Sequence, residues 1–505
     1  MGRHYLGALA LLLGAASCVQ ILGIDPARGG WTAGTGGATS TSGTGGTGGA
    51  VGTGGAEADG GCTGGSGGSA PLVCDAQTVC WDLLWGNAAT TTAFAVAVDP
   101  AGGSYVVGQF SGIVKLDCAH TLTGDSAGDG FVIALTPAGT VSWVQTISGA
   151  LAQTVTSVTV DGMGNVLVGG YTQSSVPVGK LSVSPGLFAG QFTSTGTPVW
   201  VTSFGGSDGS SVDDVTTAAN GDVDLVGRFL GTINLGSGPS TASGTPIAWT
   251  GLLQNSDGLA LSGGTWGTGT GQVLNLTGFR RDGAGNTYVA GTFQGTISAP
   301  GIGMGPLTSA GGSDVFLVKY YAAPPLKILS QAQYGDAADQ SVTTLAVDGS
   351  GDTLLGGRFA GTLNYGGTPY TAPAGGTALF VLYGGPNLWA YSFGSGPGEV
   401  HASMDPAGEV VLAGGFLGAI TFDSLQVSNT TANQNIFAAK LNPMFGKPVW
   451  LRSFTGSGAS AAHAAAATSF GDSLVVGGVS GAISLGDGGT QTAPGADAFV
   501  ARLGQ

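Results

Sequence analysis

Residues 282–293 read DGAGNTYVAGTF, and this stretch decides the fold. Its first part contains Asp, Gly and Asn, which tolerate the left-handed backbone of a short hairpin turn. Its second part is an apolar strand that contains Gly291. Related turns occur at 161–165 (DGMGN) and 348–352 (DGSGD). Because glycine weakens a strand, a repeated glycine indicates a bulge or a neighbouring backbone held close.

This glycine recurs in a fixed order with two aromatic positions through residues 81–503. The strand glycines are Gly108, Gly169, Gly227, Gly291, Gly357, Gly414 and Gly477. Each repeat also has a strand that ends at a bulky residue: Trp85, Ile147, Phe204, Trp266, Tyr334, Phe393 and Phe454. The third recurring position is Phe131, Phe188, Trp249, Phe316, Phe380, Phe437 and Phe499. The chain therefore contains seven related repeats.

Each repeat predicts about four short strands and no amphipathic helix. A lone four-stranded sheet cannot bury both faces, whereas repeats packed side by side can. Radial packing also leaves only short, protected strand edges. The sequence therefore predicts an all-β chain with a seven-bladed β-propeller over residues 72–505. The strand at 81–85 and the strand at 497–503 each lack a partner, so we expect them to pair and complete the seventh blade.

These motifs resemble bacterial SBBP-type β-propeller repeats. The similarity rests on the Asp282-to-Gly291 turn and strand, on strands such as 497–503 (DAFVARL), and on Trp-x-x-x-Phe-Gly strands. It covers most of residues 81–503. Proteins with these repeats are mostly extracellular, and the repeat has no assigned catalytic residues. The resemblance implies the fold and export, and it implies little about activity.

The N-terminus is typical of an export signal, predicted over residues 1–17. The apolar run 6–16 is too short to cross a hydrocarbon core of about 30 Å. The small residues 15–17 before Cys18 resemble a bacterial lipobox, which predicts a lipid on Cys18. Ordinary signal cleavage at the same bond is the alternative and would give a secreted protein. Val19 after the cysteine resembles lipoproteins of the outer membrane, so we expect a lipid-anchored protein there or at the cell surface.

Residues 18–71 are predicted to be a flexible, Gly-rich linker. They contain mainly Gly, Thr, Ser and Ala, which bury too little apolar surface to offset the entropy of ordering. Four further cysteines are Cys62, Cys74, Cys80 and Cys118. An even number in an exported chain predicts two disulfides, with three possible pairings. The spacing of the cysteines does not support a metal site.

Composition limits the partners of this chain. The net charge is −15, only 9% of residues are charged, and no basic cluster is present. Nucleic acid is therefore excluded as an expected partner, because binding it requires concentrated positive charge. We expect contact with the membrane only through the lipid.

No catalytic constellation is apparent. His120, His401 and His463 lie in different repeats and are predicted to be surface or turn histidines. The acidic residues, among them Asp208, Asp213, Asp214, Asp336 and Asp339, are interpreted as solvated loop carboxylates. The Asp-Gly turns lack the alternating ligands and closing glutamate of a calcium loop, so they are interpreted as structural turns. We predict no catalytic residue, metal or cofactor.

One variable position follows the strand glycine in every repeat. It holds Gln109, Gly170, Arg228, Thr292, Arg358, Gly415 and Gly478. Equivalent positions of a propeller lie at similar radius and height, so Arg228 and Arg358 are a candidate anion-binding pair. The alternative is that they cap loop carbonyls or pair with nearby acids.

The sequence favours a non-enzymatic envelope lipoprotein whose propeller binds a protein or a glycan. The alternative function is an extracellular hydrolase or lyase acting on a polysaccharide. That enzyme would need polar and acidic side chains from several blades at one mouth. A mouth with only Gly, Ser and Thr would contradict it.

Overall fold

The computed structural model describes residues 79–86, 90–218, 220–266, 273–322, 327–396, 398–405, 408–485 and 490–505. This part of the chain consists of β-strands and contains no helix, which confirms the predicted all-β class. It accordingly contains no helix able to cross a membrane. The predicted signal at 1–17, lipid on Cys18 and linker at 18–71 lie outside the described residues.

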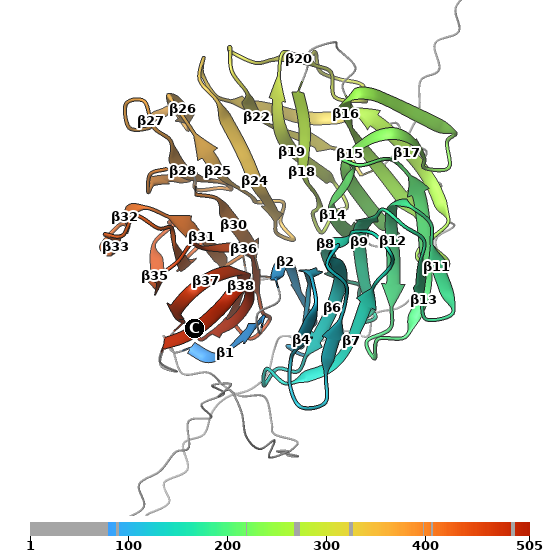
Figure 1. Ribbon diagram of the computed structural model, residues 1–505. Helices are drawn as coiled ribbons and strands as arrows, with labels where there is room; N and C mark the ends of the chain where they lie inside the picture. Colours follow the sequence, from blue (N-terminus) through green and yellow to red (C-terminus); the bar gives the residue numbers. More distant parts are fainter. Residues whose placement is uncertain are drawn as a thin grey trace, which may run out of the picture.

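The described strands form three four-stranded and two eight-stranded antiparallel sheets in a propeller-like arrangement, and each eight-stranded sheet can be divided into two four-stranded units (Figure 1). The first three units are β2 (Thr91–Val98), β3 (Ser104–Phe110), β6 (Asp129–Leu135) and β7 (Val141–Ile147); β8 (Gln153–Val160), β9 (Val166–Thr172), β12 (Gly186–Phe192) and β13 (Pro198–Gly205); β14 (Ser211–Thr217), β15 (Val223–Asn234), β16 (Pro239–Leu253) and β17 (Ala260–Trp266). The next two are β18 (Val273–Arg281), β19 (Thr287–Gln294), β22 (Asp314–Tyr320) and β23 (Ile328–Tyr334); β24 (Gln340–Val347), β25 (Thr353–Phe359), β28 (Ala378–Gly384) and β29 (Trp389–Phe393). The last two are β30 (Val400–Met404), β31 (Val410–Phe416), β34 (Asn435–Leu441) and β35 (Pro448–Gly456); β36 (Ser460–Ala467), β37 (Ser473–Ser484), β38 (Thr490–Leu503) and β1 (Val79–Trp85).

Short hairpins are inserted between the second and third strands of most units. They are β4 (Ile113–Lys115) with β5 (Thr121–Thr123), β10 (Val176–Val178) with β11 (Leu181–Val183), β20 (Thr296–Ile297) with β21 (Leu307–Thr308), β26 (Thr362–Tyr365) with β27 (Thr368–Thr371), and β32 (Gly418–Phe422) with β33 (Leu425–Asn429). In the third and seventh units the long pairs β15–β16 and β37–β38 supply the same extension.

The first strand of each unit contacts the first strand of the next. The contacts run from β2 through β8, β14, β18, β24 and β30 to β36, and β36 also contacts β2. Figure 1 shows these strands on the inner side, with the units following one another in chain order. We call them the inner strands. Apolar residues of neighbouring units pack together: Trp85 and Val500 of the seventh unit share one buried cluster with Phe131 of the first.

The two ends of the repeat region lie side by side. β1 pairs antiparallel with β38, with Trp81 opposite Arg502 and Trp85 opposite Ala498. The Arg502 guanidinium donates to the Asp472 carboxylate at 2.8 Å. It also donates to the carbonyl oxygens of Gly102 and Pro137 in the first unit, at 3.2 and 3.0 Å. Residues about 400 positions apart are thus joined through buried polar contacts.

The recurring glycine is required by a close approach of backbone and ring. A Cβ on Gly357 would collide with the carbonyl oxygen of Ser341 and lie 2.9 Å from the Phe380 ring. The equivalent glycine of the second unit is Gly170, which meets the Phe188 ring in the same way. The sequence assignment of Gly169 to this position is wrong. Two adjacent glycines made the register ambiguous, and the variable position of that unit is therefore Tyr171.

Tryptophans on the outer strands link consecutive units. Indole N–H groups donate to a turn carbonyl of the following unit: Trp81 to Pro137, Trp143 to Ser194, Trp200 to Asn255 and Trp389 to Pro443, at 2.7–3.0 Å. A glycine beneath each ring leaves room for it, as Gly196 does for Trp143. Trp450 occupies the equivalent position, but its indole N–H has no acceptor among the described residues.

Candidate functional site

The register places Arg228 and Arg358 at equivalent positions. Arg228 on β15 pairs with Ser211 of β14, and Arg358 on β25 pairs with Ser341 of β24. The exposed Arg228 donates through Nε to the Ser211 hydroxyl at 3.1 Å. Among the described residues no direct contact joins the two arginines; Arg228 instead lies near the Asp213 carboxylate, and Arg358 lies near the Glu399 carboxylate.

A second set of titratable side chains gathers around the inner strands β30 and β36 and the neighbouring strand β25. We call Arg358, Glu399, His401 and His463 the Glu399 cluster. The His401 Nε2 atom lies 3.5 Å from the Glu399 carboxylate, which is 58% exposed. His463 on β36 bonds through Nδ1 to the carbonyl oxygen of Ala93 on β2 at 2.9 Å. Its ring also stacks on Phe94, with centroids 6.2 Å apart.

The position of His463 follows from a bulge in the inner strand. Pairing between β36 and β37 shifts at Ala462/Ala464, so His463 is the extra residue. The same bulge position holds Thr156 and Thr277 in other units. The Thr277 hydroxyl donates to the Val342 carbonyl of the next inner strand at 3.0 Å. His463 makes the corresponding link between the seventh and first units.

Electrostatics set the charges of this cluster. The His401 imidazole 3.5 Å away, with His463 and Arg358 nearby, holds the pKa of Glu399 below its ordinary value, so this carboxylate is ionised at neutral pH. Burial lowers the pKa of His463, which keeps the imidazole neutral at pH 7. Burial also raises the pKa of Asp213, against a hydrogen bond from Ser211.

These findings correct two sequence interpretations. His401 and His463 lie on inner strands, so their assignment as surface or turn histidines is wrong. Asp213 and Asp214 lie within β14 and are not loop carboxylates; Asp214 pairs with Arg280. His120 does lie in an exposed turn, where it contacts Asp117 at 2.9 Å.

The Asp-Gly turns are closed by their own carboxylates. In the turn between β8 and β9, Asp161 accepts hydrogen bonds from the backbone N–H groups of Met163 and Asn165 and from the Asn165 amide, at 2.8–2.9 Å. Asp282 bonds the backbone N–H groups of Ala284 and Asn286 in the same manner. These contacts account for the carboxylates as turn-forming groups. Within the described ranges, no three His, Cys, Asp or Glu side chains are grouped to hold a metal ion.

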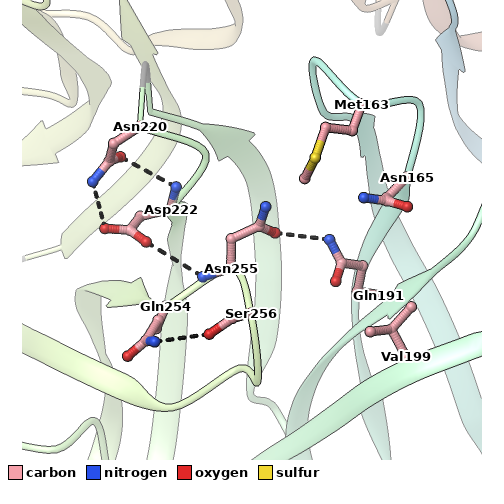
Figure 2. A pocket seen from close by; sticks show the side chains of 9 residues that line it. All are labelled: Met163, Asn165, Gln191, Val199, Asn220, Asp222, Gln254, Asn255 and Ser256. Carbon is pink, nitrogen blue, oxygen red and sulfur yellow. Dashed lines mark hydrogen bonds between the residues drawn. The ribbon is translucent and has the colours of Figure 1, made fainter. Parts of the chain in front are cut away.

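A separate pocket of about 470 Å³ opens between the second and third units (Figure 2). We call it the amide pocket. It is lined by Met163, Asn165, Gln191, Val199, Asn220, Asp222, Gln254, Asn255 and Ser256. These residues come from the β8–β9, β14–β15 and β16–β17 turns and from the ends of β12 and β13. The pocket is distant in sequence from the Glu399 cluster and shares no residue with it.

Hydrogen bonds fix the side chains of the amide pocket. Gln191 donates to the Asn255 side-chain oxygen at 2.7 Å, and the Asn255 backbone N–H donates to Asp222 at 3.3 Å. Figure 2 shows this chain of contacts continuing from Asp222 to Asn220. Burial acts to raise the pKa of Asp161, but hydrogen bonds from Asn165, Met163 and Asn255 outweigh it and hold the pKa below its ordinary value. The sequence analysis missed this site because it depends on turns that are separated along the chain.

The structure describes two of the four cysteines that were predicted to form disulfides. Cys80 on β1 and Cys118 after β4 are both disulfide-bonded. Cys62 and Cys74 lie outside the described residues.

Comparisons with known proteins show a distant likeness. No family model matches the chain, and no curated protein matches it. A solved protein of unknown function from Dyadobacter fermentans is 10% identical, with a TM-score of 0.38, over 85% of this chain and 99% of its own. An ulvan lyase of polysaccharide lyase family PL25 is 8% identical, with a TM-score of 0.41, over 75% of this chain and 88% of its own. The quinohemoprotein alcohol dehydrogenase of Comamonas testosteroni is 11% identical, with a TM-score of 0.38, over 83% of this chain and 76% of its own. At these levels the likeness carries no argument about activity.

Proposed function

We propose that this chain is an exported, envelope-anchored protein that binds an acidic glycan without cleaving it. The binding site is the end of the inner strands where Arg228, Arg358 and the Glu399 cluster lie. The main support is that Arg228 and Arg358 occupy equivalent positions in their units, each paired with a serine of the inner strand. Guanidinium groups recognise carboxylate and sulfate groups through paired hydrogen bonds. A net charge of −15 disfavours non-specific attraction to a polyanion, so recognition depends on these local groups.

We propose that the repeats are of the SBBP type and form a closed seven-bladed β-propeller. It is supported by the contact between β36 and β2 and by the pairing of β1 with β38. The predicted domain is residues 72–505, with the lipid on Cys18 and the linker 18–71 tethering it to the outer membrane or cell surface. We also propose that two disulfides form among Cys62, Cys74, Cys80 and Cys118.

Membrane attachment is tested by fractionation. The Cys18→Ala variant should move from the membrane fraction to the soluble exported fraction and lose incorporation of labelled palmitate. A chain that stays in the membrane without Cys18 would contradict lipid anchoring. Full release of the wild-type chain would instead favour ordinary signal cleavage.

Glycan binding is tested with polygalacturonate, using neutral dextran as the control polymer. The chain should bind polygalacturonate alone, and the Arg358→Gln variant should bind about tenfold more weakly, which corresponds to about 1.4 kcal/mol. Exposed Lys180, outside the site, provides the matched control Lys180→Gln. Equal binding of both polymers, or no effect of Arg358→Gln, would contradict the proposal.

The affinity should also depend on pH. Because the pKa of His463 is lowered, its positive charge appears only below about 6.5. Glu399 stays ionised in this range, since its pKa is also lowered. Polygalacturonate binding should therefore strengthen as the pH falls from 7 and His463 becomes protonated, and the His463→Gln variant should lose that increase. Binding should weaken as NaCl is added.

The second candidate function is a hydrolase or lyase acting on an extracellular polysaccharide. It is favoured by the convergence of Glu399, His401 and His463 from two units, since acid–base chemistry uses such groups. Product formation from polygalacturonate that disappears in Glu399→Gln would establish this function. Binding without turnover, retained in Glu399→Gln, supports the non-enzymatic protein.

A further inference from the structure

We propose that the amide pocket is a second, independent site that binds an uncharged sugar. This site goes beyond acidic-glycan binding at the inner strands and does not depend on it.

The hydrogen-bond network holds the amides in one orientation. Gln191, only 3% exposed, is bound between Asn255 and the turn of Asp161, with its amide nitrogen 3.4 Å from the Asp161 carboxylate. Asn165 is held by the same carboxylate at 2.9 Å. Gln254 donates to the Ser256 hydroxyl at 2.7 Å. In each case the amide nitrogen is engaged, which fixes where the amide oxygen lies.

Those amide oxygens are left as free acceptors. Among the hydrogen bonds of the described residues, none is accepted by the side-chain oxygens of Asn165, Gln191 or Gln254. All three residues line the pocket. A ligand for this site must therefore supply several hydrogen-bond donors, as the hydroxyl groups of a sugar do.

The charge of the pocket excludes anions. Asp222 lines it and Asp161 lies directly behind it, while no lysine or arginine is among the lining residues. The pKa of Asp161 is lowered, so this carboxylate is ionised at neutral pH. A carboxylated or sulfated ring would be repelled, whereas a neutral ring would not.

The rim supplies apolar contact. Met163 is 76% exposed and Val199 is 43% exposed, and both line the pocket (Figure 2). The C–H face of a sugar ring can pack on such side chains while its hydroxyls reach the amides. The volume of about 470 Å³ lies within the range of small-molecule sites.

One turn makes this pocket specific to the third unit. Trp200 donates to the Asn255 carbonyl just as Trp389 donates to the Pro443 carbonyl of the sixth unit, so Asn255 and Pro443 are equivalent. The neighbouring residues Gln254 and Asn442 also correspond, since each accepts the backbone N–H of the turn glycine at 2.9 Å. The hydrogen bonds that these turns accept from the tryptophan and the glycine use only backbone carbonyl groups. The side chain of Asn255 is therefore free to build a site that proline cannot.

The experiment is ligand-observed NMR and calorimetry on the full chain with cellobiose, maltose and di-N-acetylchitobiose. At least one of these neutral disaccharides should bind, with millimolar or tighter affinity. Gln254→Ala should weaken that binding about fivefold, as expected for one lost hydrogen bond, and Asn165→Ala combined with Gln254→Ala should weaken it further. The matched variant Asn442→Ala should bind like the wild type, and thermal melting should show that all variants fold.

The outcome separates the two sites. Arg358→Gln should weaken the binding of polygalacturonate and leave that of the disaccharide unchanged, whereas Gln254→Ala should weaken only the binding of the disaccharide. Failure of all three disaccharides to bind would overturn the sugar pocket and leave the acidic-glycan site untouched. Unchanged disaccharide binding in the double variant would place the sugar elsewhere and also overturn it.

Discussion

At the scale of single residues, one buried carboxyl opposes folding at neutral pH. Asp497 lies within strand β38, two residues before Phe499, and is 2% exposed; among the described residues its Oδ1 atom has no hydrogen-bond partner. Burial raises its pKa to about 6. The same strand position in the sixth unit holds Asn435, whose side-chain oxygen accepts the Gly456 N–H at 3.4 Å. A neutral amide is therefore compatible with this place in the fold.

Asp497→Asn should stabilise the protein above pH 6. The folded state holds its proton more tightly than the unfolded state, in which the pKa is near 3.8. Ionisation thus removes stability as the pH rises from about 4 to 6, and the asparagine avoids this loss. We expect roughly 2–3 kcal/mol in urea unfolding at pH 7.5, shrinking to zero near pH 4. A gain that is equal at both pH values would show that the carboxyl charge is not the cause.

The sequence predicted the role of residues whose packing is the same in every unit. It did not predict the role of residues whose surroundings differ in one unit. The strand glycines were found because each one must admit a carbonyl oxygen and an aromatic ring. Gly169 was chosen over Gly170 because pattern alone cannot distinguish neighbouring glycines. His463 was misjudged because a bulge, which depends on pairing with β37, turns it toward β2.

At the scale of elements, the outer strands are joined by tryptophan as well as by apolar packing. β13 and β35 both begin with Pro-Val-Trp, and Trp200 and Trp450 are 5% and 3% exposed. Trp200 donates to the Asn255 carbonyl, whereas no acceptor for the Trp450 indole N–H is found in the part of the chain that the structure describes. The two strands thus form a natural matched pair.

Trp200→Phe should cost more stability than Trp450→Phe. Both variants lose similar buried area, but the first also loses a hydrogen bond and leaves the Asn255 carbonyl without its donor. The difference should be about 1 kcal/mol in denaturant unfolding. Equal losses would mean that the indole hydrogen bond adds nothing to the contact between units.

The sequence predicted the order of the strands but not the amide pocket. Strand order follows from a pattern that recurs every repeat. The pocket depends on Gln191, Asn220 and Asn255, which come from different turns and meet only after two units pack together. The one local signal was the longer β16–β17 turn with its run of polar residues at 254–258.

At the scale of the whole molecule, basic residues on the third strands join neighbouring turns. Lys440 contacts Glu409 of its own unit at 2.6 Å and donates to the Gly471 carbonyl of the next at 2.8 Å. Arg502 repeats this arrangement with Asp472 and Gly102 across the junction of the two chain ends. The Lys/Arg of the repeat motif is thus explained by a structural role.

Arg502→Met should destabilise the protein by about 3–5 kcal/mol, because it leaves the Asp472 carboxylate buried without its partner. Combining it with Asp472→Asn should recover part of the loss, since the unpaired charge is then removed. Thermal unfolding followed by circular dichroism measures both. If the double variant is as unstable as Arg502→Met, the carbonyl contacts to the first unit matter more than the ion pair.

The strand β1 has a mechanical consequence. Any tension on the segment preceding Val79 enters the domain through this strand, whose ladder with β38 runs from Val79 to Trp85. A pull directed along β1 strains these hydrogen bonds together in shear, whereas a perpendicular pull would unzip them singly. Where the proposed tether pulls along β1, drag on a captured polymer would therefore be shared by all the hydrogen bonds of this ladder.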